Sequence, residues 1–332
     1  MKMIFALTIP LFALSLLVTS EACCQEQYVM EDGKFDTWIS VGKGGGGDML
    51  ILPDQGNPPP CISATTHSGS SEYASLLMYS DDHFWNPSIG GTLLSVNFEI
   101  QVYSYDAWGQ GQLIWPLLVQ DNHNYVPNAW STTGSAQEWV DLTGFPPYSD
   151  ESFCLANDAF FEFGDPNQLI TDTHPDFSSR GSPITFGFAV ANHVSNDYTN
   201  WYDNWKMTLT YSTCPVPDAK INGSDGPLNV SCVNTVDFTI TLDPSLSSGG
   251  PADWWVFVMK DSMVTYWWNY PNKWEESATS IRAAAATLRS VNDYSVYKGL
   301  LPVGTYTFTF AVDTQNNVYE GTYIDTCELT IF

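Results

Sequence analysis

The residues best suited to chemistry alternate along one predicted strand. Residues 96–103 alternate apolar and polar side chains with a period of two, which predicts a half-buried strand. Aromatic rings contact the C–H faces of sugars, and amide or acidic side chains bind their hydroxyl groups. We therefore predict a glycan-binding face, with an ordinary solvated sheet face as the alternative. The side chains opposite the core are amides, an acid and phenols: Asn97, Glu99, Gln101, Tyr103 and Tyr105.

Two further aromatic residues fall in predicted loops beside glycines and asparagines. Trp108 and Trp130 would add a stacking surface to the same site. The partner that these residues favour is a glycan or the extracellular matrix.

Motifs for catalysis are missing from the sequence. The five histidines have no G-x-S-x-G partner motif, and neither H-E-x-x-H nor a P-loop is found. Glu99 has no acidic neighbour two or four residues away, as a pair of glycosidase carboxylates on one strand face would need. We expect no enzyme, and we keep a polysaccharide-active enzyme as an alternative.

The seven cysteines lack metal-ligand spacing and predict disulfides. Strand parity points Cys232 and Cys327 inward from the first and last strands of the second half, so we pair them. Cys24, or its neighbour Cys23, should lie near Cys214 and pair with it. Cys61 and Cys154 are then left to pair with each other. The remaining cysteine would be free, lipidated or bonded to another chain.

The positions of these residues depend on strands, which dominate the prediction. We expect strands at 96–103, 113–120, 184–192, 205–211, 236–242, 254–259, 264–270, 305–312 and 327–331. Residues 277–288 could form at most a turn or two of helix. Two prolines in 214–218 cannot join a central sheet, so the domain boundary is placed there. The expected domains are 23–213 and 214–332, each a β-sandwich.

The first 22 residues resemble a secretory signal peptide, with a cationic start, an apolar run too short for a membrane helix and small residues near residue 22. We expect a secreted or cell-surface protein without a transmembrane segment. The formal net charge of −26 makes nucleic acid and anionic lipid poor partners.

A cluster of tryptophans lies in the second half. In the adjacent pairs 254–255 and 267–268, strand geometry sends one ring to each face of a sheet. We take Trp254 and Trp267 as interface residues that meet a neighbouring domain or another copy of the chain. This supports a second hypothesis, a subunit of an extracellular filament or surface coat.

Two segments resemble known families. Residues 184–188 and 201–209, with 89–93, look like the jelly-roll modules of secreted bacterial proteins, laminin type IV domains and carbohydrate-binding modules; this resemblance covers 28–213. Residues 222–227, 252–256 and 301–308 resemble an immunoglobulin-like module of exported bacterial surface proteins. The resemblances imply an all-β chain with a jelly-roll sandwich before an immunoglobulin-like sandwich, displayed at the bacterial surface.

The jelly-roll resemblance also implies a structural calcium ion where the first and last strands meet. The corresponding acids would be Glu31 or Asp36 with Asp203, since hard oxygen ligands suit Ca²⁺. Turn acids that cap backbone amides are the alternative.

Overall fold

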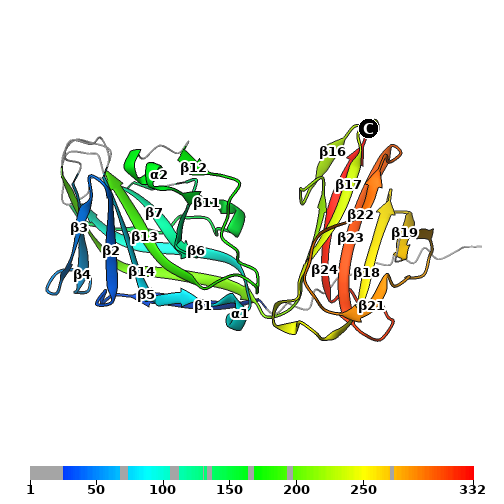
Figure 1. The fold of residues 1–332 in the computed structure, drawn as a ribbon, viewed down its shortest axis with the longest axis horizontal. Helices are drawn as coiled ribbons and strands as arrows, with labels where there is room; N and C mark the ends of the chain where they lie inside the picture. The colour runs from blue at the N-terminus through cyan, green and yellow to red at the C-terminus, as the bar shows by residue number, and fades with distance from the viewer. Residues whose placement is uncertain are drawn as a thin grey trace, which may run out of the picture.

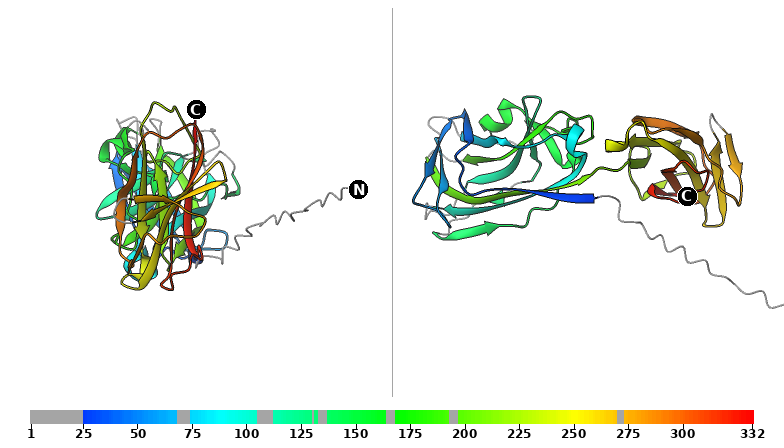
Figure 2. Two further views of the ribbon diagram at one scale, coloured as in Figure 1. Left: turned by 90° about the vertical axis from the view of Figure 1, so that its right-hand side faces the viewer. Right: turned by 90° about the horizontal axis from the view of Figure 1, so that it is seen from below.

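The computed structural model describes residues 25–67, 74–104, 112–129, 131–132, 137–163, 168–192, 197–269 and 273–332. The predicted signal peptide lies outside these residues. The described chain forms two β-sandwiches, which lie end to end and are linked between β14 and β15 (Figures 1 and 2). An all-β chain with a jelly-roll sandwich followed by an immunoglobulin-like sandwich was predicted, and this fold class is confirmed.

The N-terminal sandwich consists of a six-stranded and an eight-stranded sheet. The six-stranded sheet has the order β10 (Trp139–Leu142), β6 (Thr92–Ser104), β14 (Tyr198–Ser212), β4 (Cys61–Thr66) and β3 (Gly47–Leu52), and β1 (Gln25–Asp32) also pairs with β14. The eight-stranded sheet has the order β12 (Leu169–Ile170), β11 (Phe153–Ala156), β8 (His123–Pro127), β7 (Leu113–Gln120), β13 (Ile184–Asn192), β5 (Ala74–Trp85) and β2 (Trp38–Gly44), and β9 (Ser131–Thr132) pairs with β7. Short helical turns are α1 (Pro87–Gly90), η1 (Asp150–Ser152) and α2 (Asp158–Phe163).

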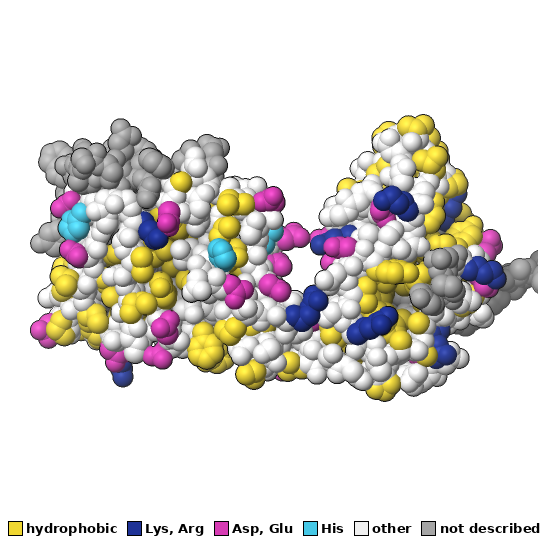
Figure 3. Space-filling view, in the orientation of Figure 1, with side chains coloured by type: hydrophobic (Ala, Val, Ile, Leu, Met, Phe, Trp, Pro, Cys, Tyr) yellow, Lys and Arg dark blue, Asp and Glu magenta, His cyan; other side chains and the backbone are white. Residues whose placement is uncertain are grey.

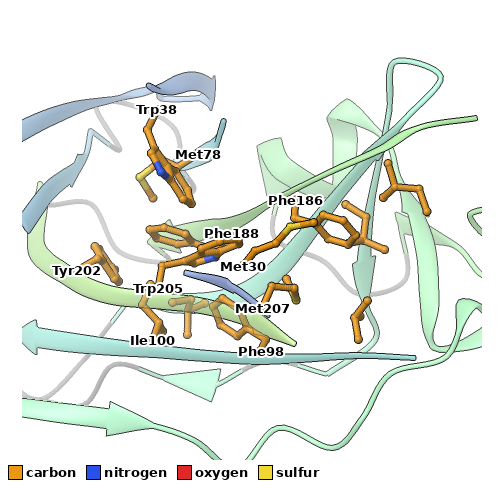
Figure 4. Packing of buried hydrophobic residues seen from close by; sticks show 14 of the residues in the cluster. Met30, Trp38, Met78, Phe98, Ile100, Phe186, Phe188, Tyr202, Trp205 and Met207 are labelled. Atoms are coloured by element: carbon orange, nitrogen blue, oxygen red, sulfur yellow. The ribbon is translucent and has the colours of Figure 1, made fainter. Parts of the chain in front are cut away.

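The core of this sandwich follows from strand alternation. Every second residue of β6 faces inward, and Val96, Phe98, Ile100 and Val102 are buried against the opposite sheet. Trp205 lies at the centre with its ring edge-on to Trp38, and the close view shows both among the surrounding phenylalanine and methionine side chains (Figure 4). Because this face is buried, the other face of β6 is left for polar groups.

The C-terminal sandwich packs a three-stranded sheet on a seven-stranded one. The small sheet has the order β15 (Val216–Ile221), β17 (Val236–Asp243) and β22 (Val291–Gly299). The large sheet has the order β16 (Leu228–Val230), β24 (Tyr323–Ile331), β23 (Gly304–Thr314), β18 (Pro251–Lys260), β19 (Val264–Asn269) and β20 (Lys273–Glu276), with β21 (Ala284–Thr287) also paired to β18. A helical turn, η3, spans Ser245–Ser247.

Predicted and observed strands agree closely. β7 and β13 have the bounds that alternation predicted, and the remaining predicted segments fall within or overlap β6, β14, β17, β18, β19, β23 and β24. Residues 277–288, for which at most a turn or two of helix was predicted, contain no helix. Their alanine run forms strand β21, because Ala284 pairs with Trp254 at the edge of the large sheet.

Both predicted interface tryptophans are buried within the chain. Trp254 faces the core between the two sheets and is 8% exposed, so it is the inward member of its pair. Trp267 faces outward as predicted, but it is 7% exposed because Trp255, Phe257 and Tyr319 pack around it. These rings stabilise the outer face of the large sheet instead of meeting solvent.

The predicted Cys232–Cys327 disulfide is wrong, and both residues are free thiols. Parity placed Cys327 correctly, since it is buried in the core. However, β16 runs parallel to β24, and the exposed Cys232 donates its backbone N–H to the carbonyl of Phe332. Five residues of strand, about 17 Å, therefore separate Cys232 from Cys327, whereas bonded cysteines have Cα atoms at most about 7 Å apart.

The predicted Cys61–Cys154 disulfide is also wrong, since both are buried free thiols. Cys61 alternates with the core residue Ile62, so its side chain lies on the outer face of the six-stranded sheet. Cys154 packs on the outer face of the eight-stranded sheet beside Phe160. The whole core separates the two sulfurs. Cys214 is disulfide-bonded, but Cys23 and Cys24 lie outside the described residues, so the pairing with Cys24 stays a prediction.

Candidate functional site

The candidate site lies on the outer face of the six-stranded sheet, where β10, β6, β14 and β1 lie side by side. The register aligns outward residues in rows that run across the strands. Trp139, Tyr103 and Trp201 form one row, and Asp141, Gln101 and Asp203 form the next. A third row contains Glu99, Lys206 and Glu31. Cross-strand neighbours on one face are within contact distance, so these nine residues share one continuous sheet face, on which Asp203 is buried beside the loop before β4.

The first row is an aromatic ridge, formed by Trp139, Tyr103 and Trp201. Tyr103 stacks on Trp201 with ring centroids 5.2 Å apart and an interplanar angle of 23°. Trp139 lies on its other side, with centroids 5.7 Å apart and the rings tilted by 56°. All three side chains are partly exposed. The ridge therefore offers a stiff apolar surface to solvent.

Next to the ridge lies a hollow of about 490 Å³ with a largely polar lining. We call it the polar hollow and define it by Glu31, Glu99, Gln101, Asp141, Asn204 and Lys206, which all line it. Gln101 is at its centre: its side-chain amide donates to Asp141 at 2.6 Å and accepts from the Asn204 amide at 2.8 Å. Lys206 donates to Glu99 at 3.2 Å. These partners hold the side chains in place before any ligand arrives.

A β-bulge in β14 orients the side chain of Asn204 toward the polar hollow. The register with β6 shifts between Asp203 and Lys206, and Asn204 adopts a left-handed backbone with φ of 49°. Asparagine tolerates this conformation better than most residues. Its amide donates both to Gln101 and to the carbonyl of Asn57, at 2.8 and 2.6 Å. The bulge therefore links the polar hollow to the loop before β4.

The structure brings together most of the predicted site. Glu99, Gln101 and Tyr103 contribute to the hollow or the ridge, and Asn97 lies on the same face, opposite Thr208, one row beyond Glu99. The predicted residues Tyr105, Trp108 and Trp130 lie outside the described residues, so their role stays a prediction.

The remaining members come from strands distant in sequence and were missed. Trp139 and Asp141 belong to β10, and Trp201, Asn204 and Lys206 belong to β14. Strand parity would place Trp201 on the outer face, because the next residue, Tyr202, points inward. No local sequence pattern shows that β10 and β14 pair with β6. The Asp-Asn sequence at 203–204 is the one local signal of the bulge.

Calcium ligation by Glu31 or Asp36 with Asp203 stays a prediction. Asp203 is buried, and its two carboxylate oxygens accept the backbone N–H groups of Asn57 and Asn204. Burial raises the pKa of this carboxyl, and those hydrogen bonds oppose the shift. Glu31 and Asp36 are exposed, and no three His, Cys, Asp or Glu side chains within the described ranges are arranged to hold a metal. In this structure the carboxylate of Asp203 caps the backbone amides of the turn that follows it and of the loop before β4.

None of the helices in the described part of the chain is both long and apolar enough to cross a bilayer.

No family model and no curated protein matches the chain. Among solved structures, it is similar to a family 11 carbohydrate-binding module from Clostridium thermocellum in complex with a β-1,3-1,4-mixed-linked tetrasaccharide, at 13% identity and a TM-score of 0.33 over 54% of this chain and 94% of that one. It is also similar to a β-1,2-glucanase from Parabacteroides distasonis, at 10% identity and a TM-score of 0.29 over 91% of this chain. A β-glucuronidase from Bacteroides uniformis matches at 12% identity and a TM-score of 0.23, also over 91% of this chain. The chain spans 37% and 32% of the lengths of these two hydrolases.

Proposed function

We propose that the protein is an exported, non-catalytic glycan-binding protein, and that the polar hollow and the aromatic ridge form its binding surface. The observation that carries this proposal is the register that sets an aromatic row directly beside a row of hydrogen-bonding side chains. Sugars need both kinds of surface, since their C–H faces are apolar and their hydroxyls donate and accept hydrogen bonds.

The side chains around the hollow suit a neutral or weakly polar sugar. Gln101 and Asn204 offer amide groups, and Asp141 offers a carboxylate oxygen that is not used by Gln101. Because these groups are already held by one another, binding orders few side chains and loses little entropy. The ridge supplies the apolar contact that such a ligand needs at its ring face.

Binding is favoured over hydrolysis by the state of the acids. Glu99 is paired with Lys206 and Asp141 accepts from Gln101, so both side chains are engaged in positioning contacts. A glycosidase needs two carboxyl groups on opposite sides of the scissile bond, one of them protonated. The polar hollow offers open access, and the buried acid of the neighbouring row, Asp203, uses both carboxylate oxygens to accept backbone N–H groups.

Glycan-array screening followed by calorimetry on the hits would test the proposal. Tyr103→Ala and Trp201→Ala each remove a ring of the ridge and should weaken binding by about tenfold. Phe84→Ala is a matched control, because Phe84 is an aromatic residue that is 50% exposed on the opposite sheet. Binding that survives both ridge substitutions, or no binding across a broad array, would contradict the proposal, and sugar release by the protein would revive the enzyme alternative.

A further inference from the structure

The C-terminal sandwich is covered unevenly. Its small sheet has three strands and its large sheet has seven, so the small sheet cannot cover the large one. On one side β15 packs against β24. On the other side β22 is the last strand of the small sheet, while β19 and β20 extend the large sheet beyond β18. The inner faces of these outer strands are therefore open at the side.

Aromatic side chains line this open side. A hollow of about 400 Å³ lies between β18, β21 and β22, with Trp254, Trp268 and Tyr294 among its walls. The rings of Trp268 and Tyr294 approach each other across the two sheets, with centroids 6.1 Å apart. In the space-filling view, hydrophobic side chains line a hollow on this sandwich and Lys or Arg side chains lie close to it (Figure 3).

A second hollow of about 240 Å³ continues along the same strands. Tyr266, Trp274 and Tyr297 line it, and Trp274 meets Tyr297 with centroids 6.5 Å apart. Inward residues of β18, β19 and β22 contribute to both hollows in order along each strand. We call the two hollows together the aromatic groove.

Each hollow also contains one cation. Arg289 lines the larger hollow and Lys260 the smaller, where its ammonium lies 5.7 Å from the centroid of the Tyr306 ring. Most other bases of this acidic chain are paired with carboxylates. Neither Arg289 nor Lys260 has a carboxylate within ion-pair distance among residues that the structure describes. In a chain of net charge −26, two cations without carboxylate partners beside aromatic walls leave positive charge available for an anionic ligand.

We propose that the aromatic groove is a second binding site, and that its ligand is an acidic polysaccharide built from uronic acid units. Pyranose rings would contact the aromatic walls, and their carboxylates would pair with Arg289 and Lys260. A polymer is favoured over a single small anion because Arg289 and Lys260 lie near opposite ends of β18, whose ten residues span roughly 30 Å. The site is separate from the polar hollow and does not depend on it.

Titration of the mature protein with polygalacturonate at an ionic strength of about 0.15 M, where a Debye length of about 8 Å screens the net negative charge of the chain, tests this inference. We expect binding with a change in tryptophan fluorescence, because the half-buried Trp274 lines the groove together with the buried Trp254 and Trp268. Arg289→Gln should weaken binding by roughly tenfold or more through loss of a charge-assisted pair. Tyr294→Ala provides a second variant with little risk to folding, since this residue is 42% exposed.

Lys298→Gln is the matched control. It removes one positive charge from β22, the strand that follows Arg289, but the Lys298 side chain is 68% exposed and pairs with Asp237 away from the groove. It should change the affinity less than twofold. Equal losses in Arg289→Gln and Lys298→Gln, equally tight binding of a neutral glucan, preference for a sulfated glycan, or occupation of the groove by a second copy of the chain would each overturn the inference. Tyr103→Ala should leave polygalacturonate binding intact, so this site and the N-terminal site fail independently.

Discussion

At the scale of single residues, Asn204 shows how backbone and binding chemistry are combined. Its left-handed backbone is what the bulge requires, and its side chain donates to Gln101 and Asn57. Two substitutions separate these contributions. Asn204→Gly keeps the left-handed backbone without strain and loses the side-chain hydrogen bonds, whereas Asn204→Ala loses the same hydrogen bonds and strains the backbone.

We expect both variants to weaken glycan binding similarly, because Gln101 loses the same partner in each. Asn204→Ala should also unfold more easily than Asn204→Gly, by about 1 kcal/mol for the left-handed alanine. Urea titration and calorimetric binding would measure the two effects. Equal stability of the variants would show that the bulge imposes no backbone requirement at this position.

The residue types of the site could be predicted only in part. Alternation along one strand placed Glu99, Gln101 and Tyr103 on a common outer face, and they lie there. It could not supply Trp139 or Trp201, because strand pairing joins residues that are far apart in the sequence. Parity is a local property, and pairing is a property of the whole sheet.

At the scale of elements, the cysteines show the same limit. Strand parity correctly predicted that the side chain of Cys327 points inward. Which residue lies beside Cys327 depends on β16 running parallel to β24, and parity does not predict that direction. Gly226 lies beside Cys327: a Cβ atom at this glycine would come within 3.0 Å of the Cys327 sulfur. No alternation of residue types reports strand direction.

This arrangement predicts how the thiols react. Cys232 is exposed and should be alkylated in the native protein. Burial, together with the nearby charge of Asp203, raises the pKa of Cys61 to about 11, and burial also raises the pKa of Cys327 to about 11. These thiols and Cys154 should react only after unfolding, because they are buried and protonated. Peptide mapping after alkylation would check this, and recovery of a Cys232-to-Cys327 cross-linked peptide without reduction would contradict it.

At the scale of the whole molecule, one carboxylate joins the two sandwiches. Asp243, at the end of β17, accepts the Thr92 hydroxyl at 2.7 Å and both the hydroxyl and the backbone N–H of Ser179, at 2.6 and 2.8 Å. Ser245 adds a backbone donor from its own sandwich and reaches back to the carbonyl of Ser212. The sequence predicted two sandwiches, but nothing in it showed that Asp243 would lie at their junction, since its partners are about 60 and 150 residues away.

Asp243→Asn should destabilise the protein by about 2 kcal/mol, because several hydrogen bonds lose a charged acceptor. Burial opposes ionisation, but the hydrogen bonds from Ser179 and Thr92 outweigh it and lower the pKa of Asp243. Its folded-state pKa is thus below the unfolded value, so the stabilisation is present above about pH 4. It should be lost as the pH falls through the lowered folded-state pKa.

Urea unfolding of the wild type and of Asp243→Asn between pH 2 and 7 would measure this difference. Asp237→Asn is the control, since Asp237 forms a surface pair with Lys298 and should contribute less than about 1 kcal/mol. A difference in unfolding free energy between wild type and Asp243→Asn that stays constant down to pH 2 would show that the ionised carboxylate of Asp243 does not stabilise the junction.

Hydroxyl-radical footprinting with and without a glycan identified by array screening tests the binding surface most directly, because it reports individual aromatic side chains in the unmodified protein. The ridge of Trp139, Tyr103 and Trp201 should become protected, while the exposed Phe84 on the opposite sheet should keep its reactivity. Protection of Phe84 or of other residues on that sheet, with an unchanged ridge, would show that the protein binds glycan elsewhere and would contradict the proposed function.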